Sequence, residues 1–381
     1  MNLYEKIWYL QVKSTKIRNG IQQYIMEDLA SKFLAKYKDN FLKKLKNTDN
    51  NSVISSLRNT SGNDQNFINQ VIQLKNEHCY IYYNNDHLQS LILETLNLAL
   101  IYDNIDKEVS KQSENKKADE IDHEEILIKE LLRYFKDDFF KWTNQPDCSS
   151  CGKNDNQQFL RGERPNTEEF NRDSKCGHVE VYKCNSCGTI TRFPRYNSPA
   201  VLLETRQGRC GEWAALFTYI LVSFQIRTRY IWNKEDHVWC EYFNTKEKRW
   251  IHLDSCEKAY DEPHIYARNW NKKMSYVIGF SDTGIADLSK KYVDNVNKGN
   301  MINRSSMRND EEMYKLVTAL NNDIRSSYPP DLHFSLHQED EKEYLNLNYP
   351  NGSPTKTHDF DTKGRQSGSA EWVSSRGEGG N

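Results

Sequence analysis

The 381-residue sequence lacks any run of about 20 apolar residues, the length that a membrane-spanning helix needs. Its first residues, MNLYEKIWYLQVKS, also lack the basic start, apolar core and small-residue cleavage site of a secretory signal peptide. We therefore expect no membrane insertion. The expected location is the cytoplasm, with the nucleus as a second compartment.

The sequence has little net charge and a low content of hydrophobic residues. Its 52 Lys and Arg against 54 Asp and Glu leave a formal charge of -2, so the basic excess of many nucleic-acid-binding proteins is missing and we expect no nucleic-acid partner. Hydrophobic residues make up 37% of the chain, which is low for a compact globular protein. The polar residues 340–381 are accordingly predicted to form a flexible tail.

Helical and strand-like patterns occupy different halves of the chain. Apolar residues recur every three or four positions over 21–45, 91–105 and 124–142, which predicts three helices. The polar residues 48–66 are expected to form a loop. Short alternating runs at 227–233, 237–243, 249–255 and 274–280 predict strands. This order predicts an α+β fold with a helical N-terminal half and an antiparallel sheet.

Two C-x-x-C pairs, each followed by glycine, indicate a metal site. Nine cysteines in a chain without a signal peptide favour metal binding over disulfides. Four thiolates form a closed shell for one structural zinc ion and leave no position for water. A redox pair or chance spacing is the alternative, and Cys176 and His178 are rival ligands outside the pairs. The predicted ligands are Cys148, Cys151, Cys184 and Cys187.

The stretch GRCGEW places Cys210 immediately before a run of apolar residues at helical spacing. Cys210 should therefore occupy the first turn of a buried helix. The free N–H groups and the positive end of the helix dipole at that position favour a thiolate. The alternative is an unreactive buried cysteine.

A cysteine nucleophile needs a base and an acceptor that orients the base, and His237 and Asp254 are the candidates. If the chain reverses between Thr245 and Lys246, His237 lies directly opposite Asp254 on the neighbouring strand. The rivals are weaker, because Cys240 faces the other side of the sheet and Cys256 has no helix start beneath it. His252 is set aside on strand parity relative to Asp254.

The segments GRCGEWAALFTYIL, DHVWCEYF and WIHLDSCE, with the doubled C-x-x-C, are similar to those of cytoplasmic peptide:N-glycanases of the short fungal form. That family belongs to the transglutaminase-like superfamily and has a papain-like catalytic arrangement. The similarity covers roughly residues 20 to 300. It implies that Cys210 is the nucleophile, His237 the base and Asp254 the orienting acid, and that the four paired cysteines bind zinc.

The resemblance implies hydrolysis of the amide that joins an N-linked glycan to asparagine, through a thioester, with conversion of asparagine to aspartate. The implied substrates are misfolded N-glycosylated proteins in the cytosol, which links the activity to ER-associated degradation. The backbone N–H of Cys210 is the expected oxyanion donor, with Trp142 or Asn144 as a second. Trp250 is assigned to the core. The expected sugar-contacting residues are Trp239, Glu241, Glu257 and Trp270.

The resemblance also implies a domain organisation and a protein partner. Residues 67–335 form the transglutaminase-like catalytic core, with the zinc-binding subdomain at 143–195 inserted in it. Residues 1–47 contain a helix that either packs on the core or docks a ubiquitin-binding proteasome shuttle protein. Residues 340–381 form the tail.

Three other functions remain open at the level of sequence. Related folds occur without catalysis in damaged-DNA-recognition proteins, although those relatives lack the three catalytic residues. A transglutaminase would pass the acyl group to an amine instead of to water, and the triad alone does not separate transfer from hydrolysis. A zinc-bearing scaffold would need no reactive cysteine at all.

Overall fold

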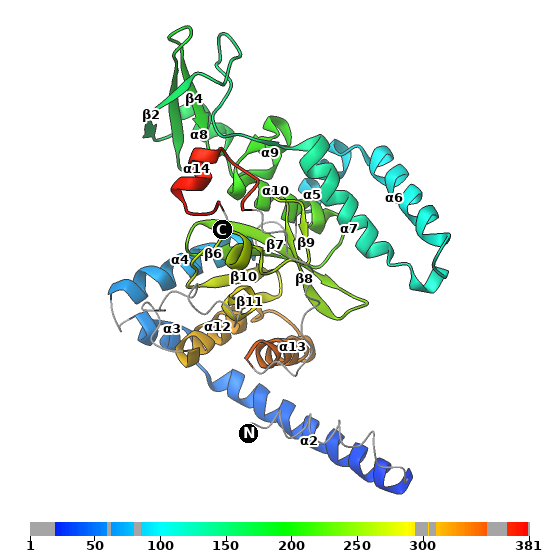
Figure 1. Cartoon of the computed structure of the whole chain (residues 1–381). Helices are drawn as coiled ribbons and strands as arrows, with labels where there is room; N and C mark the ends of the chain where they lie inside the picture. The colour runs from blue at the N-terminus through cyan, green and yellow to red at the C-terminus, as the bar shows by residue number, and fades with distance from the viewer. Residues whose placement is uncertain are drawn as a thin grey trace.

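The structure is a computed structural model of the chain, and it describes residues 20–58, 62–79, 85–293, 304, 310–348 and 364–379. Figure 1 shows a central sheet with helices on both sides, a smaller sheet at one end of the molecule, and a long N-terminal helix at the other end. Residues 1–19 of the predicted N-terminal unit lie outside the described residues.

The central sheet has six strands in the order β11-β10-β6-β7-β8-β9, and each neighbouring pair is antiparallel. This confirms the antiparallel sheet predicted from the alternating runs. The strands are β6 (Thr228–Asn233), β7 (His237–Asn244), β8 (Arg249–Asp254), β9 (Ala259–Tyr260), β10 (Val277–Ser281) and β11 (Gly284–Asp287).

Helix α10 (Cys210–Ser223) packs on one face of this sheet, against β6 and β7. Twelve of its fourteen residues are buried, because α5 (Asp86–Thr95) and α9 (Pro199–Thr205) cover its other side. Further out, α6 (Leu98–Ser113) packs against α7 (His123–Tyr134), which continues into the π-helical turn η2 (Phe135–Phe139). Asn85, Asn97 and Asp122 cap the N-termini of α5, α6 and α7. The helical N-terminal half is thus confirmed.

The opposite face of the sheet carries a second apolar cluster. Its large side chains come from β7, from the π-helical turn η3 (Ile265–Asn269) and its flank, and from α11 (Ser289–Tyr292). Trp239, Tyr266, Trp270 and Tyr292 are each at most 1% exposed. Alternate residues of β7 therefore point into two different cores.

The loop expected over residues 48–66 is wrong. Helix α3 (Asn50–Arg58) forms there and α4 (Gly62–His78) begins before residue 66. Ile54 and Leu57, one turn apart, give α3 a narrow apolar face that packs against α12 (Asp310–Ile324). The polar composition therefore reflects the exposed sides of these helices and not a loop.

Helix α2 (Gly20–Asn47) spans the segment in which periodicity predicts a helix. Figure 1 shows it extending away from the central sheet, and it contacts α13 (Pro330–Asn348). The Phe41 ring stacks on His337 with centroids 4.3 Å apart, and Tyr37 lies 5.8 Å from Phe334. The contact thus depends on a few aromatic side chains.

The smaller sheet is formed by β2 (Gln157–Glu163), β3 (Val179–Cys184) and β4 (Ile190–Pro194), with the short helix α8 (Thr167–Arg172) between β2 and β3. It lies within the predicted zinc-binding subdomain. A two-residue parallel pairing of β1 (Lys141–Trp142) with β5 (Gln207–Gly208) closes the base of this insertion.

The C-terminal part of the chain differs from the flexible tail expected over 340–381. Residue 340 lies inside α13, and residues 364–379, which include α14 (Ala370–Ser375), pack on the core. This segment is folded because it carries a buried ion pair: Arg365 and Glu378 are 5% and 0% exposed and pair with one another at 2.8 Å. Polar composition alone does not reveal that two charges are buried together.

Among the helices of the described residues, none combines the length and the apolar character needed to cross a lipid bilayer.

Candidate active site

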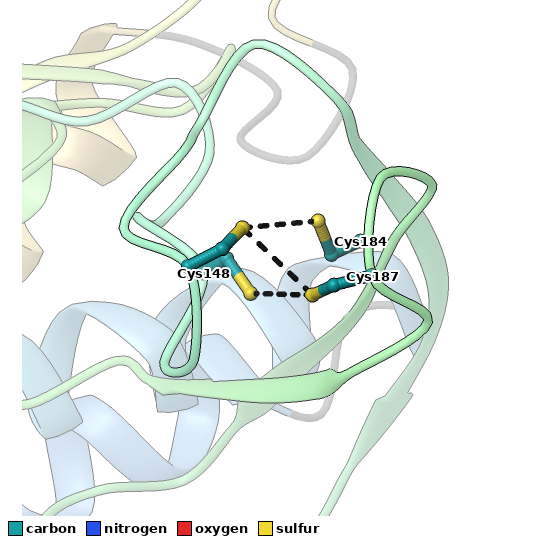
Figure 2. A group of neighbouring side chains, drawn as sticks. Cys148, Cys184 and Cys187 are labelled. Atoms are coloured by element: carbon teal, nitrogen blue, oxygen red, sulfur yellow. Dashed lines mark hydrogen bonds between the residues drawn. The ribbon is translucent and has the colours of Figure 1, made fainter.

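The four predicted zinc ligands form one cluster at the end of the smaller sheet (Figure 2). Their sulfur atoms all lie within 4.8 Å of one another. Sulfur–sulfur distances of 3.5 Å (Cys148 to Cys187), 3.7 Å (Cys151 to Cys184) and 3.8 Å (Cys151 to Cys187) match the roughly 3.8 Å edge of a tetrahedron with Zn–S bonds of about 2.3 Å. The cluster could hold a metal ion, and its donor set fits zinc.

The glycine after each C-x-x-C pair makes the turn that gathers the sulfurs. Gly152 and Gly188 have φ of 70° and 78°, the left-handed region in which glycine is favoured. Their N–H groups donate to the carbonyl oxygens of Cys148 and Cys184 at 2.9 and 2.7 Å. The rival ligand Cys176 lies outside the cluster, where its thiol donates to the carbonyl oxygen of His178.

Cys210 is the first residue of α10 and is half-buried. The helix start is fixed by Glu212, whose carboxylate accepts the backbone N–H of Arg209 at 3.0 Å. The thiol therefore sits beside free N–H groups at the positive end of the helix, as the apolar pattern after GRCGEW predicts. This position favours a nucleophile by geometry.

A cluster of buried charges connects the start of α10 to the smaller sheet that carries the four-cysteine cluster. Glu180 on β3 accepts from both terminal nitrogens of Arg209, at 2.7 Å each. Arg195 follows β4 and pairs with both carboxylates, at 3.1 Å to Glu180 and 2.6 Å to Glu212. Sequence reasoning missed these four residues, although Arg209 and Glu212 flank the cysteine within GRCGEW.

The suggested second oxyanion donors lie next to the nucleophile in the β1–β5 pairing, where Trp142 is opposite Gly208. The indole N–H of Trp142 already donates to the side-chain oxygen of Asn144 at 2.9 Å. The side chain of Arg209 also donates to the carbonyl oxygens of Thr143 and Asn144, at 3.0 Å each. Arg209 therefore holds this loop beside Cys210.

His237 and Asp254 are brought together, but not by the predicted register. The β7–β8 ladder pairs Cys240 with Leu253 and Asn244 with Arg249, a shift of two residues from the expected pairing of His237 with Asp254. An even shift keeps side chains on the same face, so the two residues still meet diagonally. The Nε2 atom of His237 donates to Oδ2 of Asp254 at 2.9 Å.

Asp254 accepts further hydrogen bonds that the sequence did not indicate. Its Oδ1 atom accepts the backbone N–H of Cys256 at 2.8 Å, and the Tyr266 hydroxyl donates to Oδ2 at 2.9 Å. The Nε2 atom of His252 lies 2.8 Å from that hydroxyl, since His252 and Asp254 share a strand face. Setting His252 aside on parity was therefore wrong, and its role here is to support Tyr266.

The charges of the site differ from those of free side chains. Burial and, after it, the charge of Arg365 together lower the pKa of His237 to about 4, against the opposing hydrogen bond and charge of Asp254. Burial raises the pKa of the Cys210 thiol, against the opposing effect of Arg365. The pKa of Asp254 is held well below its ordinary value, because the hydrogen bonds that it accepts from His237 and Tyr266 help to outweigh burial. Near pH 7 this arrangement contains a thiol, a neutral imidazole and a carboxylate.

The proton positions follow from these hydrogen bonds. Because the Asp254 carboxylate can only accept, the His237 proton resides on Nε2. The Nδ1 atom is buried, and among the described residues it has no hydrogen-bond partner. That nitrogen is therefore available to take a proton from a thiol.

The predicted sugar contacts occupy two different environments. Trp239 lies in the second apolar cluster, and Glu241 is 0% exposed and pairs with Arg229 at 2.5 Å and Lys291 at 2.6 Å. The structure thus places Glu241 in an internal ion-pair cluster and away from any surface that a sugar could reach. Trp270 is also 0% exposed.

Glu257 is half-buried, and its two carboxylate oxygens accept the backbone N–H groups of Gln366 and Ser367 at 2.8 and 2.9 Å. Trp250, expected in the core, is only half-buried, with the Arg229 guanidinium 4.1 Å from its ring centre. The sequence pattern did not indicate that a distant segment would bind Glu257.

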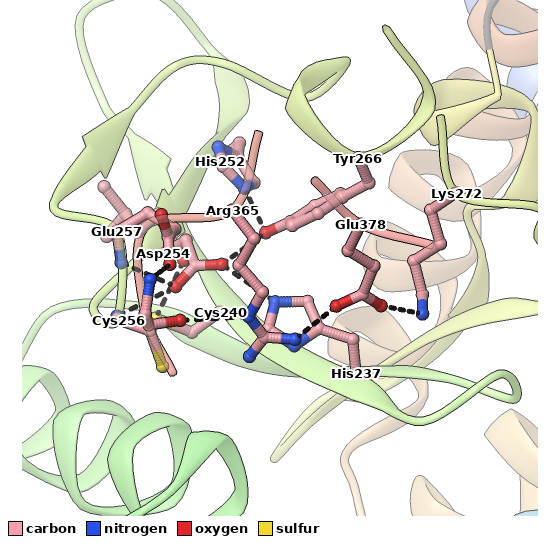
Figure 3. Close-up of polar contacts among 12 residues, drawn as sticks. His237, Cys240, His252, Asp254, Cys256, Glu257, Tyr266, Lys272, Arg365 and Glu378 are labelled. Carbon is pink, nitrogen blue, oxygen red and sulfur yellow. Dashed lines mark hydrogen bonds and ion pairs between the residues drawn. The ribbon is translucent and has the colours of Figure 1, made fainter. Parts of the chain in front are cut away.

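Arg365 is a further residue of the site that the sequence did not indicate. Figure 3 shows it among His237, Cys256 and Glu378. Its guanidinium lies 4.9 Å from the ring centre of Trp270, and the His237 ring is 5.1 Å from the same indole. A cation from the C-terminal segment thus stands beside the predicted base.

Two protein-family models match the sequence. The model of the transglutaminase-like superfamily matches residues 156–255, which include Cys210, His237 and Asp254. The model of the Rad4 transglutaminase-like domain matches residues 228–345. Both agree with the predicted transglutaminase-like fold.

Curated relatives match almost the whole chain. Proteins named peptide-N(4)-(N-acetyl-beta-glucosaminyl)asparagine amidase from Saccharomyces cerevisiae, Kluyveromyces lactis and Candida glabrata are 44%, 43% and 42% identical to it. The alignments cover 93%, 94% and 93% of this chain and 96%, 99% and 99% of the relatives. A crystal structure of Rad4-Rad23 crosslinked to undamaged DNA also matches, at 14% sequence identity and a TM-score of 0.38. The match covers 73% of this chain and 57% of that chain, and a likeness this weak carries no argument about function.

Proposed function

Because the chain belongs to the family of peptide-N(4)-(N-acetyl-beta-glucosaminyl)asparagine amidases, we propose that it removes N-linked glycans from glycoproteins as a cysteine amidase. The alternative DNA-repair role has no observation that favours it over this one. The observation that carries the proposed chemistry is the hydrogen bond from His237 to Asp254, which leaves the buried Nδ1 atom without a hydrogen-bond partner among the described residues.

In the proposed first step, Nδ1 of His237 takes the thiol proton and the sulfur of Cys210 attacks the side-chain carbonyl carbon of the glycosylated asparagine. The tetrahedral oxyanion accepts the backbone N–H of Cys210. As the intermediate collapses, the bond from carbon to nitrogen breaks, and His237 returns its proton to the departing glycosylamine.

In the second step, His237 takes a proton from water, and the hydroxide attacks the thioester carbonyl carbon. The bond from carbon to sulfur breaks, and the leaving sulfur takes the proton back from His237, which restores the thiol of Cys210 and the neutral imidazole. The product is an aspartate in place of asparagine. Asp254 stabilises the imidazolium in both steps through its hydrogen bond to Nε2.

We propose that Cys148, Cys151, Cys184 and Cys187 bind one zinc ion with a structural role. The ion would neutralise the thiolates and fix the two turns, and it takes no part in the reaction because four sulfurs complete its shell. The sulfur spacing supports this assignment.

The deciding experiment compares wild type with Cys210→Ala and with the matched control Cys79→Ala, a buried cysteine of the helical half. Each is incubated with a denatured high-mannose glycoprotein, and released glycan and a gain of about one dalton at the asparagine are measured by mass spectrometry. Wild type and Cys79→Ala should give both products, and Cys210→Ala neither. Equal activity of all three would refute the mechanism. An amine added to the assay separates hydrolysis from acyl transfer.

We also propose the substrates, the cellular compartment and the process in which the activity is used. The substrates are misfolded glycoproteins in the cytoplasm, with the nucleus as a second compartment, and the activity serves ER-associated degradation. The predicted division of the chain at residues 1–47, 67–335, 143–195 and 340–381 stays a proposal, except that 364–379 belong to the folded part.

A ubiquitin-binding proteasome shuttle protein is the proposed partner of α2. Leu29 and Leu34 on this helix are 55% and 39% exposed, which supports a docking surface on the part of α2 that precedes its contacts with α13. A chain beginning at residue 48 should lose this partner in a pull-down while it keeps amidase activity. Undiminished binding would place the docking site elsewhere.

A further inference from the structure

Residues 364–379, which we call the C-terminal strap, lie against the predicted catalytic and sugar-binding residues. Figure 1 shows α14 (red) between the smaller sheet and the central sheet. Two backbone N–H groups of the strap occupy the two carboxylate oxygens of Glu257, and the guanidinium of Arg365 lies over Trp270. Two of the four predicted substrate contacts are thus engaged by the chain itself.

The strap also contacts the side of the site that carries the base. Arg376 pairs with the carboxylate of Asp236, the residue before His237, at 2.5 Å. Burial is the largest influence on the pKa of Cys210 and of His237, and the Arg365 charge is the next largest for both. The strap therefore helps to exclude water from the reacting groups and brings a fixed cation to them.

Buried ion pairs and one tight backbone contact hold the strap in place. Glu378 is 0% exposed and pairs with Lys272 at 2.6 Å and with Arg365 at 2.8 Å (Figure 3). The Arg365 guanidinium also lies 4.4 Å from the ring centre of Trp372. Gly368 has φ of 104°, and a Cβ atom there would approach a ring carbon of Trp372 to 2.6 Å. Only glycine fits this position while the strap is seated.

The seated strap is incompatible with a bound glycan. His237 and Trp270 are 1% and 0% exposed, so no sugar ring can stack on that indole. The strap instead supplies a similar chemistry: its amide N–H groups take the place of sugar hydroxyls on Glu257, and its guanidinium takes the place of a sugar ring on Trp270.

From these contacts we propose that the C-terminal strap is an autoinhibitory segment, which occupies the glycan-binding side of the active site and leaves it when a glycosylated asparagine binds. The inference rests on the proposed amidase function. The chain then exists in a closed state and an open state, and only the open state binds substrate. The apparent KM is raised by the closed population, while kcat, which concerns the bound complex, is unchanged.

The test uses the full chain with one methyl group added to the strap. Gly368→Ala disturbs the folded strap, because its methyl group would lie 2.6 Å from a ring carbon of Trp372 at a φ of 104° that favours glycine, whereas the matched control Gly379→Ala adds its methyl where nothing lies within 4 Å. The first readout is the rate of Cys210 alkylation by a bulky maleimide, mapped by mass spectrometry, which requires no amidase activity. Gly368→Ala should raise this rate about tenfold or more, and Gly379→Ala should leave it at the wild-type value.

The second readout is the release of glycan from a denatured glycoprotein. Gly368→Ala should lower KM about tenfold at unchanged kcat. A synthetic peptide of residues 364–379 added to Gly368→Ala should restore the high KM, and a peptide that carries the same alanine should not. Trp372→Ala, which removes the stacking partner of Arg365, is the second variant and should behave as Gly368→Ala does.

Several results would overturn the proposal. If alkylation and KM are unchanged in both Gly368→Ala and Trp372→Ala, the strap does not close the site. If kcat falls instead, the strap belongs to the active catalyst and Arg365 assists the reaction. Faster alkylation without glycan release by any variant would refute the amidase function and leave the closed state intact, so the two failures are distinguishable.

Discussion

The carboxylate of Glu180 accepts hydrogen bonds from both terminal nitrogens of Arg209, at 2.7 Å each, and thereby fixes the residue that precedes the nucleophile. Hydrogen bonding and the charges of Arg209 and Arg195 overcome burial and lower the pKa of Glu180 to about 2. The pair is therefore charged throughout the neutral range. Because Arg209 also holds the carbonyl groups of Thr143 and Asn144, one ion pair positions both the sulfur and the neighbouring loop.

Glu180→Gln should lower activity more than it lowers the amount of folded protein. An amide can accept only one of the two hydrogen bonds and leaves Arg209 partly uncompensated, so we expect a loss of about 2 to 4 kcal/mol in the free energy of unfolding. A displacement of the thiol by a fraction of an ångström should lower kcat roughly 10- to 100-fold. Urea titration and glycan release measure the two effects. The exposed Glu168→Gln in the same subdomain is the control, and a fall in stability alone would contradict the positioning role.

Removal of the metal should inactivate the protein reversibly. A chelator at neutral pH should release one zinc ion per chain, measured by atomic absorption, because the four sulfurs form a single cluster. Glycan release should then fall, while far-ultraviolet circular dichroism changes little, since the helices lie outside the smaller sheet. Added zinc should restore activity. Full activity of a metal-free chain would show that the zinc-bearing sheet does not support the site.

Tyr266→Phe should weaken the support of the base without removing it. The hydroxyl donates to Oδ2 of Asp254 at 2.9 Å and also bonds Nε2 of His252, so its loss leaves that buried nitrogen without its hydrogen bond. We expect a loss of about 1 to 3 kcal/mol in stability and a kcat lowered about tenfold at similar KM. Tyr260→Phe, which loses a 2.8 Å hydrogen bond to Tyr242 away from the imidazole, is the matched control and should keep kcat. Equal kcat for the two variants would refute the role.

Acid should destabilise the protein well above the pH at which carboxylates titrate. Burial lowers the pKa of both His237 and His252 from 6.5 to about 4. Between these values the unfolded chain binds protons that the native chain excludes, so the free energy of unfolding falls as the pH falls from 6.5 toward 4, by roughly 3 kcal/mol per histidine. Above pH 6.5 these groups contribute no slope.

Urea titrations at several pH values measure this slope, and His252→Gln should flatten it. A second loss of stability is expected below pH 4.5 from Glu241. Against the effect of burial, Arg229 and Lys291 lower its pKa to about 2 in the native chain, so this carboxylate is protonated in the unfolded chain first. A free energy of unfolding that stays constant between pH 7 and 4.5 would contradict the assignment of neutral buried histidines.

The sequence was sufficient for those parts of the site that short motifs encode. The doubled C-x-x-C-G predicts the sulfur cluster, since its turns are local, and the apolar spacing after Cys210 predicts the helix start. The β7–β8 hairpin shows the limit of such reasoning. Its register differs by two residues from the expected one, because Asn244 lies at the turn and accepts the backbone N–H groups of Lys246 and Glu247. A shift of two residues keeps each side chain on the same face of the sheet, so His237 and Asp254 still meet.

Contacts between distant segments could not be predicted from composition or periodicity. The pairing of Glu180 with Arg209 joins strand β3 of the inserted sheet to the start of helix α10. Arg365 reaches the site from a C-terminal segment whose polar composition is typical of disorder. Glu241 illustrates the converse: its strand parity suggested a sugar contact, and the structure surrounds it with Arg229 and Lys291. Burial of this kind depends on which cations the tertiary fold delivers.

Strand β3 carries Glu180 near one end and Cys184, a proposed metal ligand, at the other, on the same face and about 13 Å apart at 3.3 Å per residue. Because the strand is short, movement of the sulfurs after loss of the ion would also displace Glu180 and weaken its hydrogen bonds with Arg209. Scarcity of the ion would therefore lower turnover per molecule before it lowered the number of intact molecules.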